Sequence, residues 1–317
     1  MTHKNTLDIV VVGGANMDYL VRGEKLPKPG ETVMGNLFQE APGGKGANQA
    51  VAATRLGAKV ALVARVGADE RGKTILKRLN EEGVDTQYVL SDEKEPTGVA
   101  LILVGEGGEK EILTAPGVNR QFSVDDVRNA ASAIQSARIL LTQLEVPLKA
   151  VMLASQLALQ VGAKVVLDPS PPVSLPDEFL KIVSLIKPNA REAEALTGVE
   201  VRNHDSAREA AQRLLERGVG AVSVQAGDEG NLIATSQDEY WFPKIPIQSV
   251  DATGAGDAFA AALAVGLLEE RSWSEVGAWA SAAAALKTTK LGAQAGLPRR
   301  DQVLALLAKE GIKPQAR

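Results

Sequence analysis

Asp251-Ala252-Thr253-Gly254-Ala255-Gly256-Asp257-Ala258-Phe259 places a glycine-rich turn and a carboxylate at the start of an alanine-rich helical segment. The glycines allow the backbone to turn tightly, and the unpaired N–H groups of the following helix attract anions. This stretch predicts a phosphate site. Asp257 is itself an anion among those groups, so we interpret it as a base that accepts a proton from an attacking hydroxyl. The alternative is a helix N-cap, a position that also favours Asp.

The composition is that of an ordinary globular protein of 317 residues, with 45% hydrophobic and 23% charged residues and a net charge of -4. The basic residues are scattered, which argues against nucleic acid as a partner. No apolar run is long enough to span a bilayer, and the first residues show no signal-peptide pattern. We therefore expect a cytoplasmic protein with no membrane partner. The chain has no cysteine, which excludes disulfides and thiolate chemistry.

Short apolar runs alternate with helical patterns over most of the chain, which predicts a parallel sheet covered by helices on both faces. The expected strands are 9–12, 60–63, 139–141, 165–167, 185–187 and 221–224. The expected helices are 47–56, 70–82, 124–135, 148–160, 192–196 and 207–217, followed by closely spaced helices in the alanine-rich region 255–287.

Two segments depart from this alternation. Residues 19–40 show period-two spacing with Pro and Gly, and residues 97–114 resemble a hairpin whose turn is Gly105-Glu106-Gly107-Gly108. We expect them to form a small projecting sheet, either a lid over a ligand or a decorated edge. A small sheet with two exposed faces has marginal stability by itself and would gain stability by pairing with a second copy. We therefore expect a homodimer. The expected division is a core of residues 1–15, 43–95 and 118–317 and a lid of residues 16–42 and 96–117.

A second glycine-rich element, Pro42-Gly43-Gly44-Lys45-Gly46-Ala47-Asn48, precedes a helix. It is not a P-loop, because Lys45 lacks the required glycine spacing and no Ser or Thr follows it. A dinucleotide-binding turn after the first strand is weakly supported, because Asp18 stands where the last glycine belongs. Asn16 and Asp18 instead follow that strand at the edge where α/β sheets bind ligands. With Lys45 and Asn48 they suit a polyhydroxyl ligand, although each alone is also a common turn residue.

Five motifs in this order resemble the PfkB-type carbohydrate kinase family: Asn16-x-Asp18, Gly43-Gly44-Lys45-Gly46-Ala47-Asn48, Glu145 after a strand, Lys187-Pro188-Asn189-x-x-Glu192, and Asp251-x-Thr253-Gly254-Ala255-Gly256-Asp257. The similarity extends from about Ile9 to Pro298. It implies an α/β chain with a three-layer α/β/α ribokinase-like fold, in which a central mostly parallel sheet carries a small projecting β-sheet lid.

The resemblance also implies an activity, the ATP-dependent phosphorylation of D-ribose to D-ribose 5-phosphate. Asp257 falls on the family's general base, and Gly254, Ala255 and Gly256 fall on its anion hole. The residues implied around the sugar are Asn16, Asp18, Gly44, Lys45, Gly46, Ala47, Asn48, Glu145 and Asp257. Relatives that act on nucleosides or fructose generally carry a different residue at the position of Lys45, which favours ribose.

For ATP, the resemblance implies a groove formed by Asn189, Gln225, Ala226, Gly227, Asp228, Glu229, Gly230, Gly256 and Ser281. Asp228 and Glu229 depart from the usual pattern, in which neutral or basic residues are frequent. Two carboxylates beside a polyphosphate weaken its binding unless they point to solvent or meet the metal.

Two metal ions are implied as well. Asn189 and Glu192 would organise Mg²⁺ through water, since oxygen ligands and retained waters suit this ion. As a first-turn helix carboxylate, Glu192 is explained equally well by the helix dipole. A K⁺ ion would be held beside the anion hole, mainly by backbone carbonyls, at Asp251, Thr253, Lys287, Lys290, Gly292 and Gly296.

Two rival functions stay open at this stage. A kinase of the same family acting on another small sugar or nucleoside would share the motifs, because a few pocket residues decide specificity. A non-catalytic sugar or nucleotide sensor on the same fold is less favoured, because the chain combines a base, an anion hole and a metal element.

Overall fold

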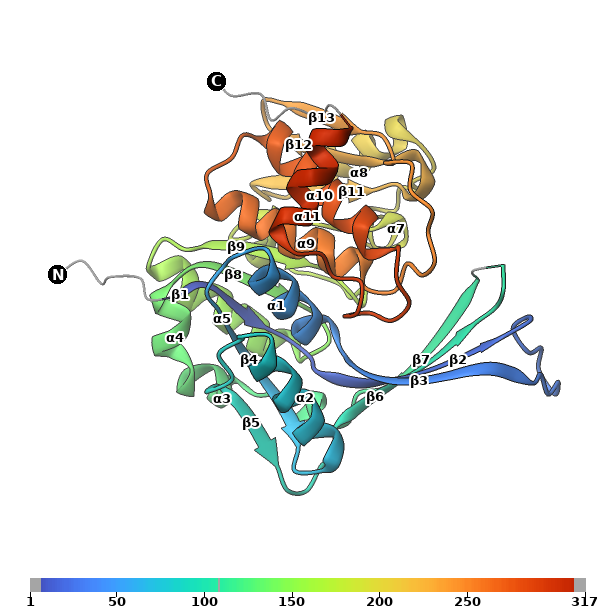
Figure 1. The fold of residues 1–317 in the computed structure, drawn as a ribbon. Coiled ribbons are helices and arrows are strands. Elements are labelled where there is room, and N and C mark those ends of the chain that lie inside the picture. Colours follow the sequence, from blue (N-terminus) through green and yellow to red (C-terminus); the bar gives the residue numbers. More distant parts are fainter. Residues whose placement is uncertain (1–6, 108, 311–317) are drawn as a thin grey trace.

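A large sheet forms the middle layer of the protein in a computed structural model, which describes residues 7–107 and 109–310 (Figure 1). Its strand order is β13-β12-β11-β10-β9-β8-β1-β4-β5. The strands are β1 (Leu7–Val12), β4 (Val60–Gly67), β5 (Val89–Asp92), β8 (Ala137–Gln143), β9 (Lys164–Asp168), β10 (Leu185–Ile186), β11 (Ala221–Gln225), β12 (Asn231–Thr235) and β13 (Glu239–Phe242). Only the β11–β12 and β12–β13 pairs are antiparallel. The predicted three-layer, mostly parallel α/β fold is confirmed.

Helices cover both faces of this sheet. One face carries α1 (Lys45–Arg55), α2 (Glu70–Glu81), α9 (Ala255–Leu268), α10 (Trp273–Lys287) and α11 (Arg300–Lys309). The other carries α3 (Val124–Asn129), α4 (Ala131–Ser136), α5 (Leu148–Gln160), α6 (Asp177–Leu180), α7 (Ala190–Thr197) and α8 (His204–Glu216). Among the described residues, no helix combines the length and the apolar character needed to cross a membrane.

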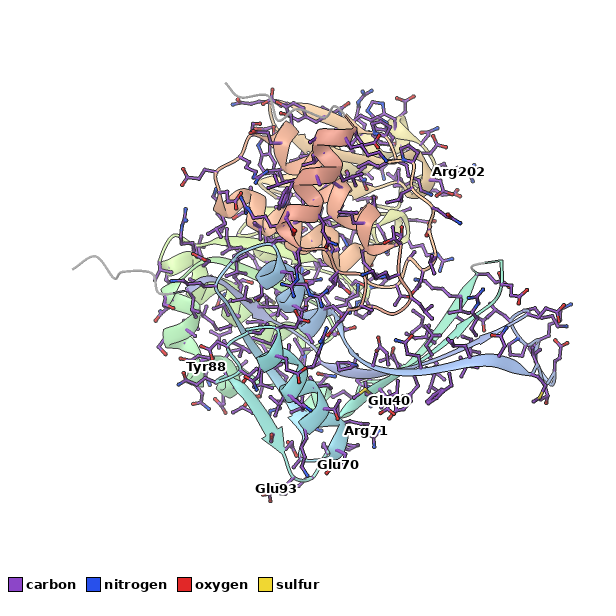
Figure 2. The ribbon with its side chains drawn as sticks, viewed as in Figure 1. Glu40, Glu70, Arg71, Tyr88, Glu93 and Arg202 are labelled. Carbon is purple, nitrogen blue, oxygen red and sulfur yellow. The ribbon has the colours of Figure 1, made fainter. Side chains whose placement is uncertain are left out.

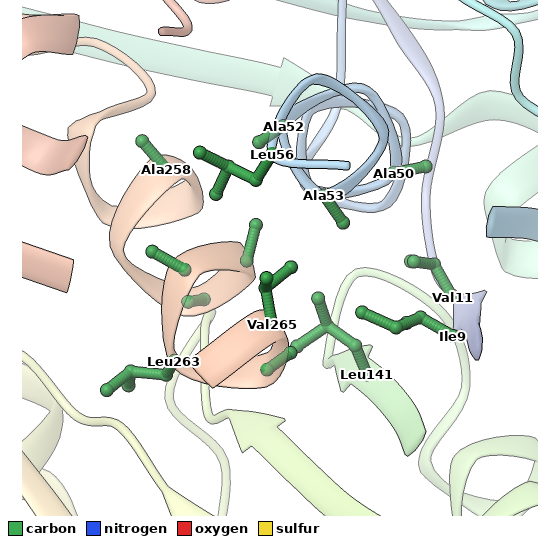
Figure 3. Close-up of a cluster of buried hydrophobic side chains, with 14 of the residues drawn as sticks. Ile9, Val11, Ala50, Ala52, Ala53, Leu56, Leu141, Ala258, Leu263 and Val265 are labelled. Carbon is green, nitrogen blue, oxygen red and sulfur yellow. The ribbon is translucent and has the colours of Figure 1, made fainter. Parts of the chain in front are cut away.

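The central strand β1 shows how the two layers are joined. Its side chains alternate between the faces of the sheet. Ile9 and Val11 belong to the core cluster under α1 and α9, whereas Val10 and Val12 belong to the cluster under α4 and α5. Figure 3 shows the first cluster, where Ala53 of α1 points toward Val265 of α9 and Ile9, Val11 and Leu141 of the strands lie below. Full burial on both faces explains why residues Ile9–Val12 of β1 form a continuous apolar run.

The prediction of one helix over residues 124–135 is wrong. The chain forms α3 and α4 instead, with a break at Ala130, where neither glycine nor proline signals it. Val127 of α3 and Ile134 of α4 belong to the same core cluster. The short strands β5 and β13 at the two edges, and β12 beside β13, were also absent from the sequence prediction, because they lack a long apolar run.

A separate four-stranded sheet projects from the main body (Figure 1). Its order is β3-β2-β6-β7, with β2 (Asn16–Gly23), β3 (Gly35–Gly43), β6 (Gly98–Val104) and β7 (Lys110–Ala115). The expected hairpin joins β6 to β7, and of its predicted turn only Gly108 lies outside the described residues. Figure 2 places Glu40 near Glu70 and Arg71, where β3 passes the start of α2. The division of the chain into core and lid stays a prediction.

Candidate functional site

A polar cavity of about 410 Å³ lies beyond the carboxyl ends of β1, β8, β9 and β10, where α1 and α9 begin. Parallel α/β sheets offer their ligand sites at this edge, because the strand ends and helix N-termini meet there. Thirteen of the 27 predicted site residues line the cavity: Asn16, Asp18, Gly44, Lys45, Asn48, Glu145, Asn189, Glu192, Gln225, Thr253, Gly254, Gly256 and Asp257.

Two predicted sugar residues, Gly46 and Ala47, do not line the cavity. Gly46 lies against the end of β1, where an added Cβ would come within 2.6 Å of the Gly13 carbonyl carbon. It serves the close packing of α1 on the strand end, and Ala47 is fully buried beside it. Because neither residue lines the cavity, the geometry does not support their predicted role in sugar binding.

Asp257 is the third residue of α9 and is 5% exposed. Its carboxylate accepts hydrogen bonds from Asn48 Nδ2 (3.0 Å) and Gln49 Nε2 (3.1 Å), and Lys45 Nζ lies 4.0 Å away. The N-cap alternative is wrong, because Gly254 occupies that position and the Asp257 side chain makes no cap bond. The carboxylate is therefore held by donors of α1 and turned to the cavity.

The turn into α9 is left-handed at Gly254, whose φ is 82°. An added Cβ there would lie 2.8 Å from the Ala293 carbonyl oxygen, so the position requires glycine. The Ala255 N–H donates to Ala252 O at 3.1 Å, and Ala255 lines a neighbouring groove rather than the cavity. Gly254 and Gly256 do line the cavity. The anion hole stays a prediction, and the geometry favours these two glycines over Ala255.

Asp168, at the end of β9, connects several functional side chains and was missed by the sequence analysis. Its Oδ1 lies 3.1 Å from Lys187 Nζ, and its Oδ2 lies 3.5 Å from Lys45 Nζ and accepts from Gln49 Nε2 at 2.9 Å. Burial disfavours the charged carboxylate, but the two ammonium groups outweigh it and keep the pKa of Asp168 below its ordinary value. The available signal was a carboxylate directly after a buried strand.

Lys45 is surrounded by acidic groups. Burial lowers the pKa of its ammonium, but the carboxylates of Asp168, Asp257 and Glu145 raise it well above the ordinary value. The backbone N–H of Lys45 also donates to Glu145 Oε2 at 2.8 Å. A permanently charged lysine at this position suits hydroxyl oxygens and phosphoryl oxygens alike.

The sugar-side residues have their own supports. Asn119 was not predicted, yet its Nδ2 donates to Asn16 Oδ1 at 2.8 Å and fixes that side chain. Burial, reinforced by Glu145 and Asp257, raises the pKa of Asp18 to about 7. Burial also raises the pKa of Glu145 to about 7, although Lys45 opposes the shift. The cavity thus holds more acidic groups than it can keep charged at neutral pH.

A second hollow of about 290 Å³ adjoins the cavity and shares Gln225 and Ala252 with it. Of the predicted nucleotide residues, Gln225, Gly227, Asp228, Gly230 and Ser281 line it, whereas Ala226 and Glu229 do not. Asp228 forms an ion pair with Lys244 across the hollow, which balances its charge. Glu229 is exposed to solvent. These positions reduce the repulsion expected between the two acids and a polyphosphate.

The small sheet also contributes to the cavity, which the sequence analysis did not specify by residue. Every second residue of two strands faces it: Ala100, Ile102, Lys110, Ile112 and Thr114. The alternation follows from the two faces of a strand. Ser170 and Lys187, after β9 and β10, are further lining residues that were not predicted.

The residues predicted for Mg²⁺ fit a site organised through water. Asn189 Oδ1 accepts from the Glu192 N–H (2.9 Å) and Glu192 Oε2 accepts from the Asn189 N–H (2.8 Å), so the pair forms the capping box of α7. Glu192 Oε1 lies outside this pair, and both residues line the cavity. Within residues 7–107 and 109–310, no three Asp, Glu or His side chains form a direct metal cage. Oxygen donors that leave room for water match Mg²⁺.

The carbonyls predicted for K⁺ do not fit a free ion. Lys287 Nζ donates to the carbonyl oxygens of Asp251 (2.9 Å) and Lys290 (3.2 Å), two of the predicted ligands. Asp251 Oδ1 accepts from the Thr253 N–H and Oδ2 from the Gly292 N–H, each at 2.8 Å. Burial lowers the pKa of Lys287 to about 8, which still leaves an ammonium at neutral pH. The predicted residues do converge, but a side-chain cation already lies among them.

The raised pKa of Asp18 predicts a pH-dependent stability. The folded protein holds a proton on Asp18 that the unfolded chain releases near pH 4, so this contribution is lost as pH rises from about 4 to about 7. We expect the melting temperature of Asp18→Asn to rise relative to wild type across this range, measured by thermal unfolding. Asp238→Asn, at an exposed position, is the control. A constant difference between Asp18→Asn and wild type at all pH values would contradict the prediction.

Comparisons with known proteins agree with this geometry. The model of the pfkB family of carbohydrate kinases matches residues 6–300. The ribokinase of Haemophilus influenzae is 41% identical over 299 residues, covering 94% of this chain and 98% of the relative. The deoxyribokinase of Salmonella typhi is 33% identical, covering 93% and 97%. The structure of Arabidopsis thaliana ribokinase complexed with ribose and ATP has a TM-score of 0.85 and 34% identity, covering 95% and 98%. The chain belongs to the pfkB family of carbohydrate kinases.

Proposed function

We propose that the protein transfers the γ-phosphoryl group of ATP to the terminal hydroxyl of D-ribose, giving D-ribose 5-phosphate and ADP. The observation that carries the proposal is the Asp257 carboxylate, fixed by Asn48 and Gln49 at the glycine-rich start of α9. It faces a cavity of polar groups that adjoins a second hollow of suitable size for a nucleotide. The names of the relatives, ribokinase and deoxyribokinase, support the same class of substrate.

In the proposed step, Asp257 accepts the proton of the attacking sugar hydroxyl while the oxygen of that hydroxyl forms a bond to the γ-phosphorus. The bond between the γ-phosphorus and the bridging oxygen breaks, and ADP leaves with that electron pair. Asn48 and Gln49 orient the base without taking its proton, because both act as donors to it. Most of the rate enhancement comes from this positioning and from charge stabilisation.

The charge that develops on the phosphoryl oxygens needs positive partners. Lys45 and Lys187 lie on either side of Asp168, and Lys187 Nζ is 3.5 Å from Gly256 O at the start of α9. Asn189 and Glu192 would hold Mg²⁺ through its waters. When bound, the ion neutralises charge on the β- and γ-phosphates.

The small sheet is proposed to act as a lid rather than a decorated edge. Ile102, Ile112 and Thr114 bring apolar and small polar groups over the cavity from β6 and β7. Closure of this wall would exclude water and limit wasteful hydrolysis of ATP. On this basis residues 16–42 and 96–117 form the lid and the rest of the chain the core.

A substrate panel tests the function and separates it from its rivals. With Mg-ATP, we expect ADP release to be fastest with ribose among ribose, 2-deoxyribose, fructose, ribulose and adenosine, because Lys45, Asn16 and Asp18 suit adjacent hydroxyls. The measurement is the coupled rate of ADP formation. Preference for another compound would support the sister-kinase alternative, and no sugar-dependent ADP at all would support the sensor.

The base is tested by Asp257→Asn. We expect kcat to fall by about two to four orders of magnitude, the usual contribution of a general base, with ribose affinity largely kept. Steady-state kinetics gives kcat, and calorimetry of ribose binding gives the affinity. Asp301→Asn, exposed on α11, is the matched control. Turnover of Asp257→Asn close to that of the wild type would contradict the assignment.

A homodimer through the small sheet is also proposed. Strand pairing places Tyr19, Val21, Phe38, Leu101 and Leu113 on one face, since Val21 pairs with Phe38 and Leu101 with both Tyr19 and Leu113. This face is opposite the one that lines the cavity, and Phe38 and Leu113 are 64% and 72% exposed. An apolar patch of this kind on a small sheet favours a second copy as its cover.

The cytoplasmic location expected from the sequence stays a prediction.

The dimer is tested by Leu113→Lys. A charge buried within the proposed interface is costly, so we expect the variant to sediment as a monomer where the wild type sediments as a dimer. Leu304→Lys, exposed on α11, is the control and should leave the assembly unchanged. A wild type that sediments as a monomer at a protein concentration of about 10 μM would contradict the proposal, because a specific dimer dissociates less readily than typical weak contacts.

A further inference from the structure

Lys287 ends α10 with its side chain inside the protein and is 0% exposed. Its Nζ donates to the carbonyl oxygens of Asp251 and Lys290 and lies 3.9 Å from Asp251 Oδ2. Lysine is almost never fully buried unless its charge is paired. The carbonyls and the carboxylate together stabilise an ammonium at this depth.

These contacts fix the segment that leads into α9. Asp251 binds the N–H groups of Thr253 and Gly292 through its two carboxylate oxygens. Thr253 directly precedes Gly254, the N-cap of α9, and Asp257 lies within electrostatic reach of the ammonium. Lys287 therefore orders the turn whose Gly254 and Gly256 line the cavity, and adds a positive charge to it.

Carbonyl oxygens that converge on one point are also the ligands by which proteins hold K⁺, because they replace its hydration shell. An ammonium group has the same charge and presents three donors to the same oxygens. Unlike an ion, it is tied to the chain and cannot dissociate. The two occupants exclude each other at the carbonyls of Asp251 and Lys290.

We propose that the Lys287 ammonium is the built-in monovalent cation of this site, so that phosphorylation needs no added K⁺. It acts as a positioning residue for the turn at the start of α9. This inference takes the place of the potassium activation that the family resemblance implies. The activity measurements that test this inference rest on the proposed function, the phosphorylation of ribose by ATP.

The wild-type enzyme gives the first test. ADP release with Mg-ATP and ribose is measured in tetramethylammonium, Na⁺ and K⁺ chloride at equal ionic strength. We expect the three rates to agree within about twofold, since the Lys287 ammonium already occupies the carbonyls of Asp251 and Lys290. Activation by K⁺ of about fivefold or more over tetramethylammonium would overturn the proposal.

The variants give the second test. Lys287→Ala frees the carbonyls and leaves space, so we expect its rate in tetramethylammonium to fall by about tenfold or more and to recover in K⁺ more than in Na⁺. Lys287→Met fills the space without the charge, and its lower rate should not recover. Lys149→Ala, exposed on α5, should behave as wild type. Full activity of Lys287→Ala without K⁺, or a loss that K⁺ cannot restore, would overturn the proposal.

Thermal unfolding in the same salts gives a readout that needs no turnover. K⁺ should raise the melting temperature of Lys287→Ala above its value in tetramethylammonium and leave that of the wild type unchanged. A K⁺-dependent rise in the wild type, or none in Lys287→Ala, would count against the inference. If ribose is not phosphorylated in any salt, the proposed function fails, and the unfolding data still decide the role of Lys287. If Lys287→Ala does not fold, the wild-type measurements decide it.

Discussion

The packing of α1 against α9 is the contact on which the site depends. The buried faces of both helices consist largely of alanine, including Ala52 and Ala53 of α1 and Ala258 of α9 (Figure 3). Small side chains let two helices approach closely, at the density of protein interiors. Because the helices are this near, Asn48 and Gln49 reach the Asp257 carboxylate across about two hundred residues of sequence. The alanine-rich composition thus serves the geometry of the base as well as the core.

Charge balance is the second constraint on the cavity. Asp18, Glu145, Asp168, Glu192 and Asp257 are gathered there with the ammonium groups of Lys45 and Lys187. The two lysines share Asp168, whose pKa stays low, whereas Asp18 and Glu145 have pKa values raised to about 7. Asp18 and Glu145, the two acidic groups with raised pKa values, are those that face the expected sugar. They titrate near neutrality, and hydroxyl donors of a ligand would favour their charged forms.

The sequence was sufficient to predict the elements that depend on local pattern. The strands at 9–12 and 60–63, the helix at 148–160 and the glycine turn before Asp257 follow from periodicity and turn chemistry. The break at Ala130 has no local signal, since neither glycine nor proline lies there. Asn119 and Gln49 were missed for a related reason. Their function lies in partners about a hundred or more residues away, which no window of sequence can reveal.

Lys287 shows how a side chain changes the meaning of a backbone motif. The sequence predicted a cation site from positions whose carbonyls act whatever the side chain, so Lys287 carried little weight there. In the folded protein its ammonium lies among those carbonyls. A tethered cation avoids the entropic cost of capturing an ion from solution, and its occupancy does not vary with salt. The cost is the burial of a charge, which lowers the pKa of Lys287 to about 8. The same backbone geometry can thus serve a mobile ion or a fixed one, and the identity of one residue decides between them.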